Sequence, residues 1–95
     1  MTDKSAYIDK AQARLRQLDA EIDKLSAKVD EVGADAKIEY QQALEDARAK
    51  RAEAQEKLDR LKSAGEDAWE DIQAGLDNAW QDLSKSVEAA ARHFR

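Results

Sequence analysis

The sequence predicts an all-α protein built from long coiled-coil helices. Of its 95 residues, 39% are charged, proline is absent and glycine occurs three times, which is the composition of long helices and coiled coils. Apolar residues recur at helical spacing through the N-terminal half. A second apolar pattern, repeating every 11 residues, lies near the C-terminus. The length suffices for one domain, so we interpret residues 1–95 as a single coiled-coil domain.

The first helix is predicted to begin at residue 3, and its apolar residues follow the spacing of a heptad repeat. These residues are Ile8, Ala11, Leu15, Leu18, Ile22, Leu25, Val29 and Val32. Such a narrow stripe is typical of a seam between chains, whereas a helix of a globular protein carries a wider apolar face. We therefore expect a homo-oligomer that associates through this seam. The alternative is a core stripe inside a monomeric bundle.

Gly33 interrupts this segment and is a candidate helix end. If the helix ended there, Asp30 and Glu31 would lie at its C-terminus, where the helix dipole disfavours anions. The seam also continues beyond the glycine, through Ala36, Tyr40, Leu44, Ala47, Arg51, Ala54, Leu58 and Leu61. Both arguments predict one heptad helix over residues 3–63, with Gly33 as its weak point.

Two residues in the middle of this helix depart from the simple pattern. Arg51 falls on the apolar seam and has two interpretations. Its guanidinium reaches a carboxylate on a partner, or its methylenes lie along the seam with the charge in water. Ile38 lies off the seam, about half a turn from Ala36 and Tyr40. It indicates a second contact face, with more than two helices meeting there.

A true break is predicted between Leu61 and Asp67. Lys62 suits the last turn of a helix, Gly65 suits a left-handed residue just beyond its end, and Glu66 suits the first turn of the next helix. The predicted architecture is a helical hairpin that self-associates, with a long helix over 3–63 and a shorter one over 66–94. Because the apolar spacing also continues across Gly65, a single continuous helix is an alternative, and a three-helix bundle is another.

The shorter helix carries the 11-residue repeat, in which Trp69 aligns with Trp80, Ile72 with Leu83 and Leu76 with Val87. A period of 11 places the aligned residues on one helix face, so we expect them to pack in the core. The complete set of predicted core or interface residues is Ile8, Leu15, Leu18, Ile22, Leu25, Val29, Val32, Tyr40, Leu44, Leu58, Leu61, Trp69, Ile72, Leu76, Trp80, Leu83, Val87 and Phe94.

The net charge of −5 lies mainly in segment 66–95, which has seven acidic and three basic residues. Nucleic acid is not an expected partner, because phosphates need a basic face. Anionic membranes are disfavoured for the same reason. The N-terminus has no apolar signal-peptide region, and no run approaches the ~20 apolar residues of a membrane span. We therefore expect a soluble cytoplasmic protein.

No catalytic, cofactor-binding or metal-ligating residues are predicted. Glu66, Asp67, Glu70 and Asp71 form carboxylate pairs, but acidic residues suit a helix start, and exposed helical carboxylates make poor calcium ligands. His93 is the only histidine, so one chain cannot assemble a histidine pair. Because phosphate loops and nucleophile elbows are also missing from the sequence, we expect a protein without enzymatic activity.

A paired Ala-Trp motif occurs in Ala64-Gly65-Glu66-Asp67-Ala68-Trp69-Glu70-Asp71 and in Ala79-Trp80. Through this motif the chain resembles small bacterial coiled-coil proteins associated with stress responses. The resemblance implies a non-enzymatic cytoplasmic protein. We therefore predict a protein that acts by self-association and protein contact, as a stress-response scaffold or protective factor. The alternative is an amphipathic helix protein on a lipid surface, which the acidic polar face of the repeat disfavours.

Overall fold

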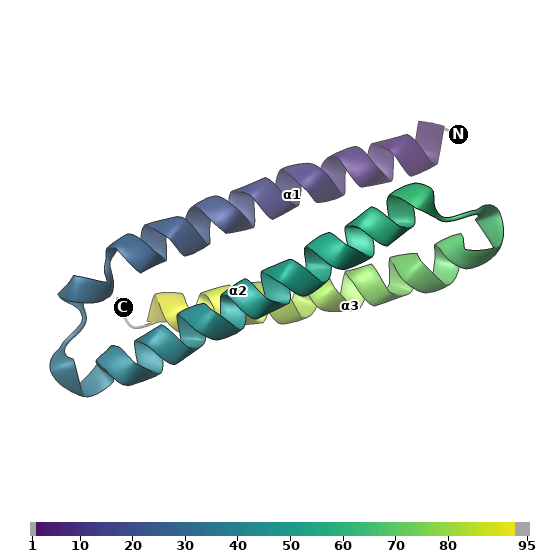
Figure 1. Ribbon diagram of the computed structural model, residues 1–95. Coiled ribbons are helices and arrows are strands. Elements are labelled where there is room, and N and C mark those ends of the chain that lie inside the picture. Colours follow the sequence, from purple (N-terminus) through teal and green to yellow (C-terminus); the bar gives the residue numbers. More distant parts are fainter. Residues whose placement is uncertain (1, 93–95) are drawn as a thin grey trace.

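A computed structural model describes residues 2–92, which form three long helices in a bundle of 50 × 18 × 18 Å. Helix α1 (Thr2–Ala27) leads through the 3-10 helix η1 (Val29–Glu31) into α2 (Ala34–Ser63), and α3 (Glu66–Ala91) follows. α1 and α3 both run antiparallel to α2 (Figure 1). The all-α prediction is confirmed. The simple hairpin is wrong, and the alternative of three packed helices is the observed architecture.

The continuous helix predicted over residues 3–63 is also wrong, because the chain turns back between Ala27 and Ala34. Val32 and Gly33 are extended at this turn, with ψ of 135° and 152°. We expected Asp30 and Glu31 to disfavour a helix end at this place. They do not oppose it, because α1 already ends at Ala27 and both residues lie in η1. Turning back is favoured because a straight helix in a single chain would leave the apolar residues of α1 in water.

The break predicted near Gly65 is confirmed. Ala64 and Gly65 are extended, and α3 begins at Glu66 with Gly65 as its N-cap. Gly65 has a φ of −79°, so the left-handed conformation predicted for it is not adopted. The acidic residues Glu66 and Asp67 lie in the first turn of α3, where they interact favourably with the helix dipole.

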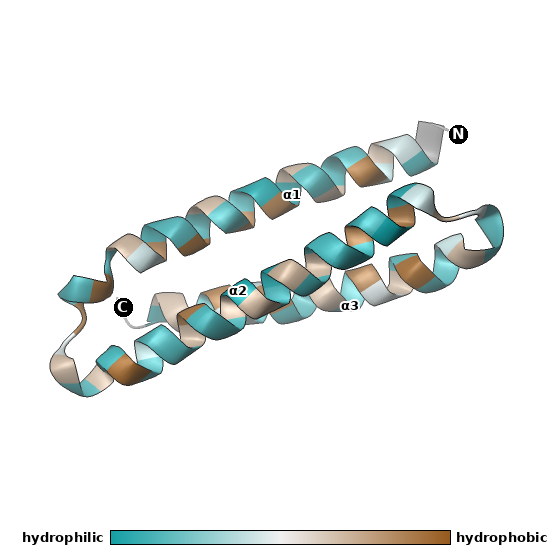
Figure 2. Ribbon diagram, in the orientation of Figure 1, coloured by the Kyte–Doolittle hydropathy of each residue, from teal (hydrophilic) through white to brown (hydrophobic). Residues whose placement is uncertain are grey.

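Apolar residues from all three helices form one core along the bundle axis, and the polar residues face outward (Figure 2). Most of the predicted core residues are buried: Leu15, Leu18, Ile22, Leu25, Val32, Tyr40, Leu44, Leu58, Leu61, Leu76, Trp80, Leu83 and Val87. Ile8, Val29, Trp69 and Ile72 are partly buried and pack against this core. Phe94 lies outside the described residues. The core also includes small residues, among them Ala47, Ala54, Ala79 and Ala90.

Ile38 does not form the second contact face predicted for it. Its exposed fraction is 68%, because it lies on the side of α2 that faces away from the core. Three helices do meet in the bundle, but they meet on the opposite side of α2, where Tyr40, Leu44 and Leu58 are buried.

Substitutions on the two faces of α2 test this placement. Leu58 is fully buried at 0% exposure, so Leu58→Ala should lower the free energy of unfolding by about 2–5 kcal/mol through lost burial and a residual cavity. Ile38→Ala, the matched control on the exposed face, should change it by less than about 0.5 kcal/mol. Denaturant unfolding followed by circular dichroism measures both. Similar effects of the two substitutions would contradict the orientation of α2.

Candidate contact surface: the docking face of α1

The bundle divides into a closely packed α2–α3 hairpin and a more lightly attached α1. α2 and α3 pack along most of their length, whereas α1 contacts α2 less extensively and α3 least. Open hollows lie along both edges of α1, one of them lined by Leu25 and Val87 and another by Leu15 and Arg51. The heptad residues of α1 are thus covered by helices of the same chain. We call the surface of α2 and α3 that covers them the docking face.

Aromatic contacts hold the beginning of α1 against α3. The Tyr7 hydroxyl donates a hydrogen bond of 2.7 Å to the Asp77 carboxylate. The Tyr7 ring meets the Trp69 ring edge to face, with centroids 6.0 Å apart and an interplanar angle of 71°. The Lys4 ammonium lies 5.1 Å from the Trp69 centroid, within range of a cation–π interaction. Sequence reasoning did not pair Tyr7 with Asp77, because Tyr7 lies beside the apolar seam and Asp77 was assigned to the polar face of the 11-residue repeat.

Trp80, the second tryptophan of the repeat, lies deeper in the same interface. Its exposed fraction is only 4%, and the Arg14 guanidinium of α1 lies 5.4 Å from its ring centroid. Between α3 and α2, the Ser86 hydroxyl donates to the Asp46 carboxylate at 2.7 Å. Trp80 therefore supports the interpretation of the repeat as a core-packing element.

An ion pair fixes the position of α1 along α2. The Nε and Nη2 atoms of Arg51 each donate to one carboxylate oxygen of Asp19, at 2.7 Å. Arg51 thus reaches a carboxylate, but one of the same chain and not of a partner, as the first interpretation had it. The two side chains are 35% and 38% exposed. Exposed pairs contribute about 0.2–1 kcal/mol, so this bidentate pair sets register more than stability.

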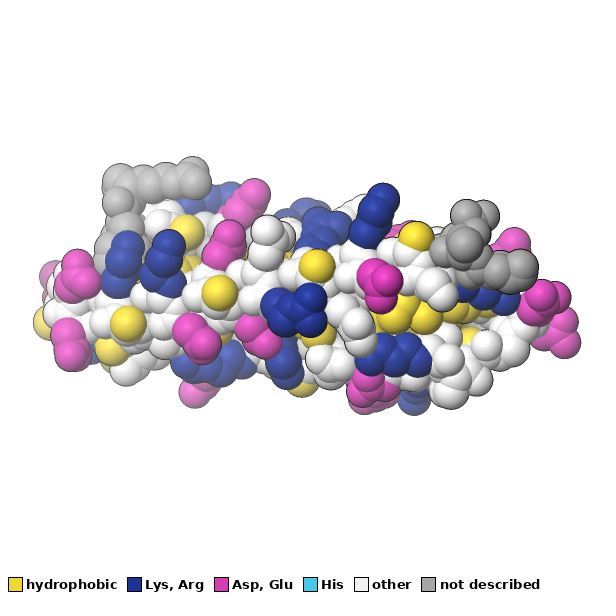
Figure 3. Space-filling view, turned by 90° about the horizontal axis from the view of Figure 1, so that it is seen from above, with side chains coloured by type: hydrophobic (Ala, Val, Ile, Leu, Met, Phe, Trp, Pro, Cys, Tyr) yellow, Lys and Arg dark blue, Asp and Glu magenta, His cyan; other side chains and the backbone are white. Residues whose placement is uncertain are grey.

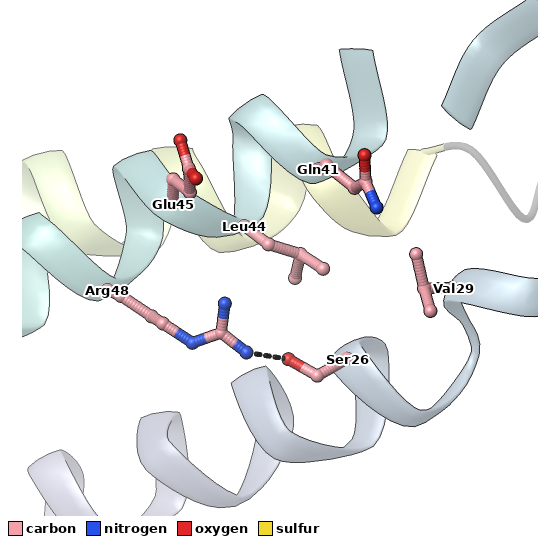
Figure 4. A pocket seen from close by; sticks show the side chains of 6 residues that line it. All are labelled: Ser26, Val29, Gln41, Leu44, Glu45 and Arg48. Atoms are coloured by element: carbon pink, nitrogen blue, oxygen red, sulfur yellow. Dashed lines mark hydrogen bonds between the residues drawn. The ribbon is translucent and has the colours of Figure 1, made fainter. Parts of the chain in front are cut away.

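The last turn of α1 is held by two residues of α2. The Tyr40 hydroxyl donates to the backbone carbonyl of Leu25, and Arg48 donates to the Ser26 hydroxyl. The second bond borders an open hollow of about 360 Å³ between α1 and α2, beside the turn (Figure 4). Its lining residues are Ser26, Val29, Gln41, Leu44, Glu45 and Arg48.

The hydroxyl groups of both tyrosines resist ionisation. Burial raises the pKa of Tyr7 above its ordinary value, and the hydrogen bond to Asp77 and the negative charge of that carboxylate raise it further. Burial likewise raises the pKa of Tyr40, and the charge of Glu31 adds to the effect. Folding therefore binds the tyrosine protons more tightly, because burial disfavours the ionised hydroxyl and the nearby carboxylates repel its charge.

The rest of the described surface is charged and mixed in sign. Lys and Arg side chains are interspersed with Asp and Glu on the face seen in Figure 3. Glu66, Asp67, Glu70 and Asp71 are exposed on α3, and within residues 2–92 no group of three or more His, Cys, Asp or Glu residues could hold a metal ion. His93 lies outside this range.

Over the same described residues, no helix has an apolar stretch long enough to cross a bilayer. No protein-family model matches the chain, and neither a curated protein nor a solved structure matches it. Among the described residues, the docking face is where the heptad stripe of α1 meets the tryptophans of the 11-residue repeat.

Tyr7→Phe tests the contact at the beginning of α1. In the parent protein, the pKa of Tyr7 is raised by folding, so its protonated hydroxyl stabilises the folded state. This stabilisation is complete below the unfolded pKa of about 10 and is lost progressively as the pH rises towards the folded pKa. Tyr7→Phe removes that contribution, so the loss of unfolding free energy between about pH 8 and pH 11 should be smaller than in the parent. Denaturant unfolding across this range measures it. An unchanged alkaline loss would contradict the raised pKa of Tyr7.

Proposed function

We propose that the protein is a non-enzymatic helical protein that acts by contact with other protein chains, in the first place with copies of itself. The observation that carries the proposal is the position of the heptad stripe. A stripe of the self-associating kind lies on α1, the helix with the least extensive contacts in the bundle. The groups that would mediate association are therefore on the element that the hairpin holds most lightly.

The character of the interior supports contact rather than chemistry as the role of this fold. Within the described residues, the buried side chains are mainly apolar. The Ser86 hydroxyl is bonded to Asp46 and the Tyr40 hydroxyl to the Leu25 carbonyl. No buried side-chain nitrogen or oxygen among the described residues lacks a hydrogen-bond partner. Since the buried polar groups are all paired, the charged outer faces are the surfaces exposed for recognition, and the heptad stripe becomes available only when α1 leaves the docking face.

We also propose a role in a stress response, as a scaffold or protective factor. The support is the resemblance of the paired Ala-Trp motif to small stress-associated coiled-coil proteins. In this chain both tryptophans contribute to holding α1, Trp69 through Tyr7 and Trp80 through Arg14. The motif thus has a structural task at the docking face, which fits a protein that works through the association of its helices.

The geometry favours protein contact over the alternative of a lipid surface. Trp80 is almost wholly buried, so the bundle would have to open before that ring could reach a bilayer. The outer face of α3 carries Glu70, Asp71 and Asp82 as exposed acidic residues, which anionic headgroups would repel.

Sedimentation equilibrium over a wide range of protein concentrations, with circular dichroism at each, tests the proposal. We expect a mean mass that rises from the monomer value with concentration, with helicity that does not depend on anionic phospholipid vesicles. A monomer at every concentration would contradict self-association. Helicity that rises only with vesicles, together with a blue shift of tryptophan fluorescence, would instead favour the lipid-surface function.

A further inference from the structure

We propose that two copies of this chain associate by exchanging α1. The connection over residues 28–33 straightens, so that α1 and α2 become one helix, and the α1 of each copy binds the docking face of the other. This inference rests on the proposed self-association and specifies its partner and its mode. The resulting dimer has two long antiparallel helices, with one α3 packed on each half.

The apolar pattern fits the straight form of the connection. Val29, Val32, Ala36 and Tyr40 continue the helical spacing of α1 into α2, and in a straight helix they would lie on one face. The bundle bends the chain within this run, over residues 28–33. In the exchanged dimer the stripe is uninterrupted, and each half of the long helix meets the same kind of surface as in the monomer.

The local contacts that hold the turn in place are weak. Gly33 precedes α2 without a side-chain capping hydrogen bond, and the ion pair across the turn, between Lys37 and Asp30, is exposed and long at 3.9 Å. The backbone bonds of the turn run from Glu31 to Lys28 at 2.9 Å and from Val32 to Val29 at 3.3 Å. A straight helix would replace these with regular bonds between residues four apart. Straightening therefore increases backbone hydrogen bonding. It separates Tyr40 from Leu25 of the same chain, and the Tyr40 hydroxyl would then meet α1 of the other copy.

The contacts that hold α1 can re-form between two chains. Asp19 pairs with Arg51 and Tyr7 with Asp77, and in the exchanged dimer each pair would join residues of different copies. The balance between monomer and dimer then depends mainly on the turn and on protein concentration, as in other exchanges of identical elements. The hollow beside the turn (Figure 4) marks the place where α1 is incompletely packed on α2.

Substitutions at Gly33 should shift this balance in opposite directions. The φ of Gly33 is −59°, Val32 before it is extended, and a Cβ at position 33 would meet nothing within 4 Å. Both alanine and proline therefore fit the closed monomer. In the straight helix, alanine is favoured over glycine, whereas proline breaks the helix.

Sedimentation equilibrium measures the effect of these substitutions on dimerisation. Gly33→Ala should raise the dimerisation constant roughly tenfold, and Gly33→Pro should lower it by at least as much. Gly65→Ala is the matched control, since a Cβ there also meets nothing within 4 Å and the exchange leaves that turn closed. A dimerisation constant that responds to Gly65→Ala but not to the Gly33 variants would overturn the exchange of α1.

Cross-linking identifies which chains contribute to each bundle. The sequence has no cysteine, so Ser26→Cys with Arg48→Cys introduces a single reactive pair at a contact between α1 and α2. In a straight helix these positions of one chain are about 33 Å apart. At concentrations where sedimentation shows a dimer, a short flexible bis-maleimide should therefore join two chains, as seen on a denaturing gel.

The outcomes separate the two proposals. Links within single chains of a dimer would overturn the exchange and leave self-association standing. A monomer at every concentration would overturn both.

Discussion

The apolar stripe of α1 must be covered by another helix, and the rest of the structure depends on this requirement. Leu15, Leu18, Ile22 and Leu25 are all less than 10% exposed in the bundle, and burying each contributes about 1.5–3 kcal/mol. The polar contacts of α1 contribute less, since most of them lie at exposed or partly exposed positions. A single chain meets the requirement by turning over residues 28–33, which places α1 on the α2–α3 hairpin.

Much of this structure was predictable from sequence, because helical periodicity identifies the residues that face a core whichever helix covers them. The buried residues of all three helices, from Leu15 to Val87, were predicted in this way. The second turn was predicted because Lys62, Gly65 and Glu66 each suit a helix end or a helix start. The first turn was missed because heptad spacing does not reveal whether a stripe meets its own chain or another. At Gly33 the continuing apolar pattern outweighed the glycine, although the helix had already ended at Ala27.

The contacts of the docking face follow from that turn, which is why sequence reasoning could not assign them. Arg51 was visible as a charge on the seam, but its partner Asp19 is identified only once α1 folds back. Tyr7 and Asp77 are 70 residues apart, and neither is among the apolar residues that the repeats align. The exchange that we propose would give α1 two binding positions, one on its own chain and one on another copy. Such bistable packing is a common basis of regulated association.

The maximum dimension of the monomer in solution tests the central claim most directly. Small-angle X-ray scattering should be recorded at concentrations where the measured mass is that of one chain. The three-helix bundle predicts a maximum dimension close to its 50 Å length, enlarged only by side chains and hydration. A monomer of about 90 Å or more, the length of an unbroken helix over residues 3–63, would show that α1 is not covered by its own chain.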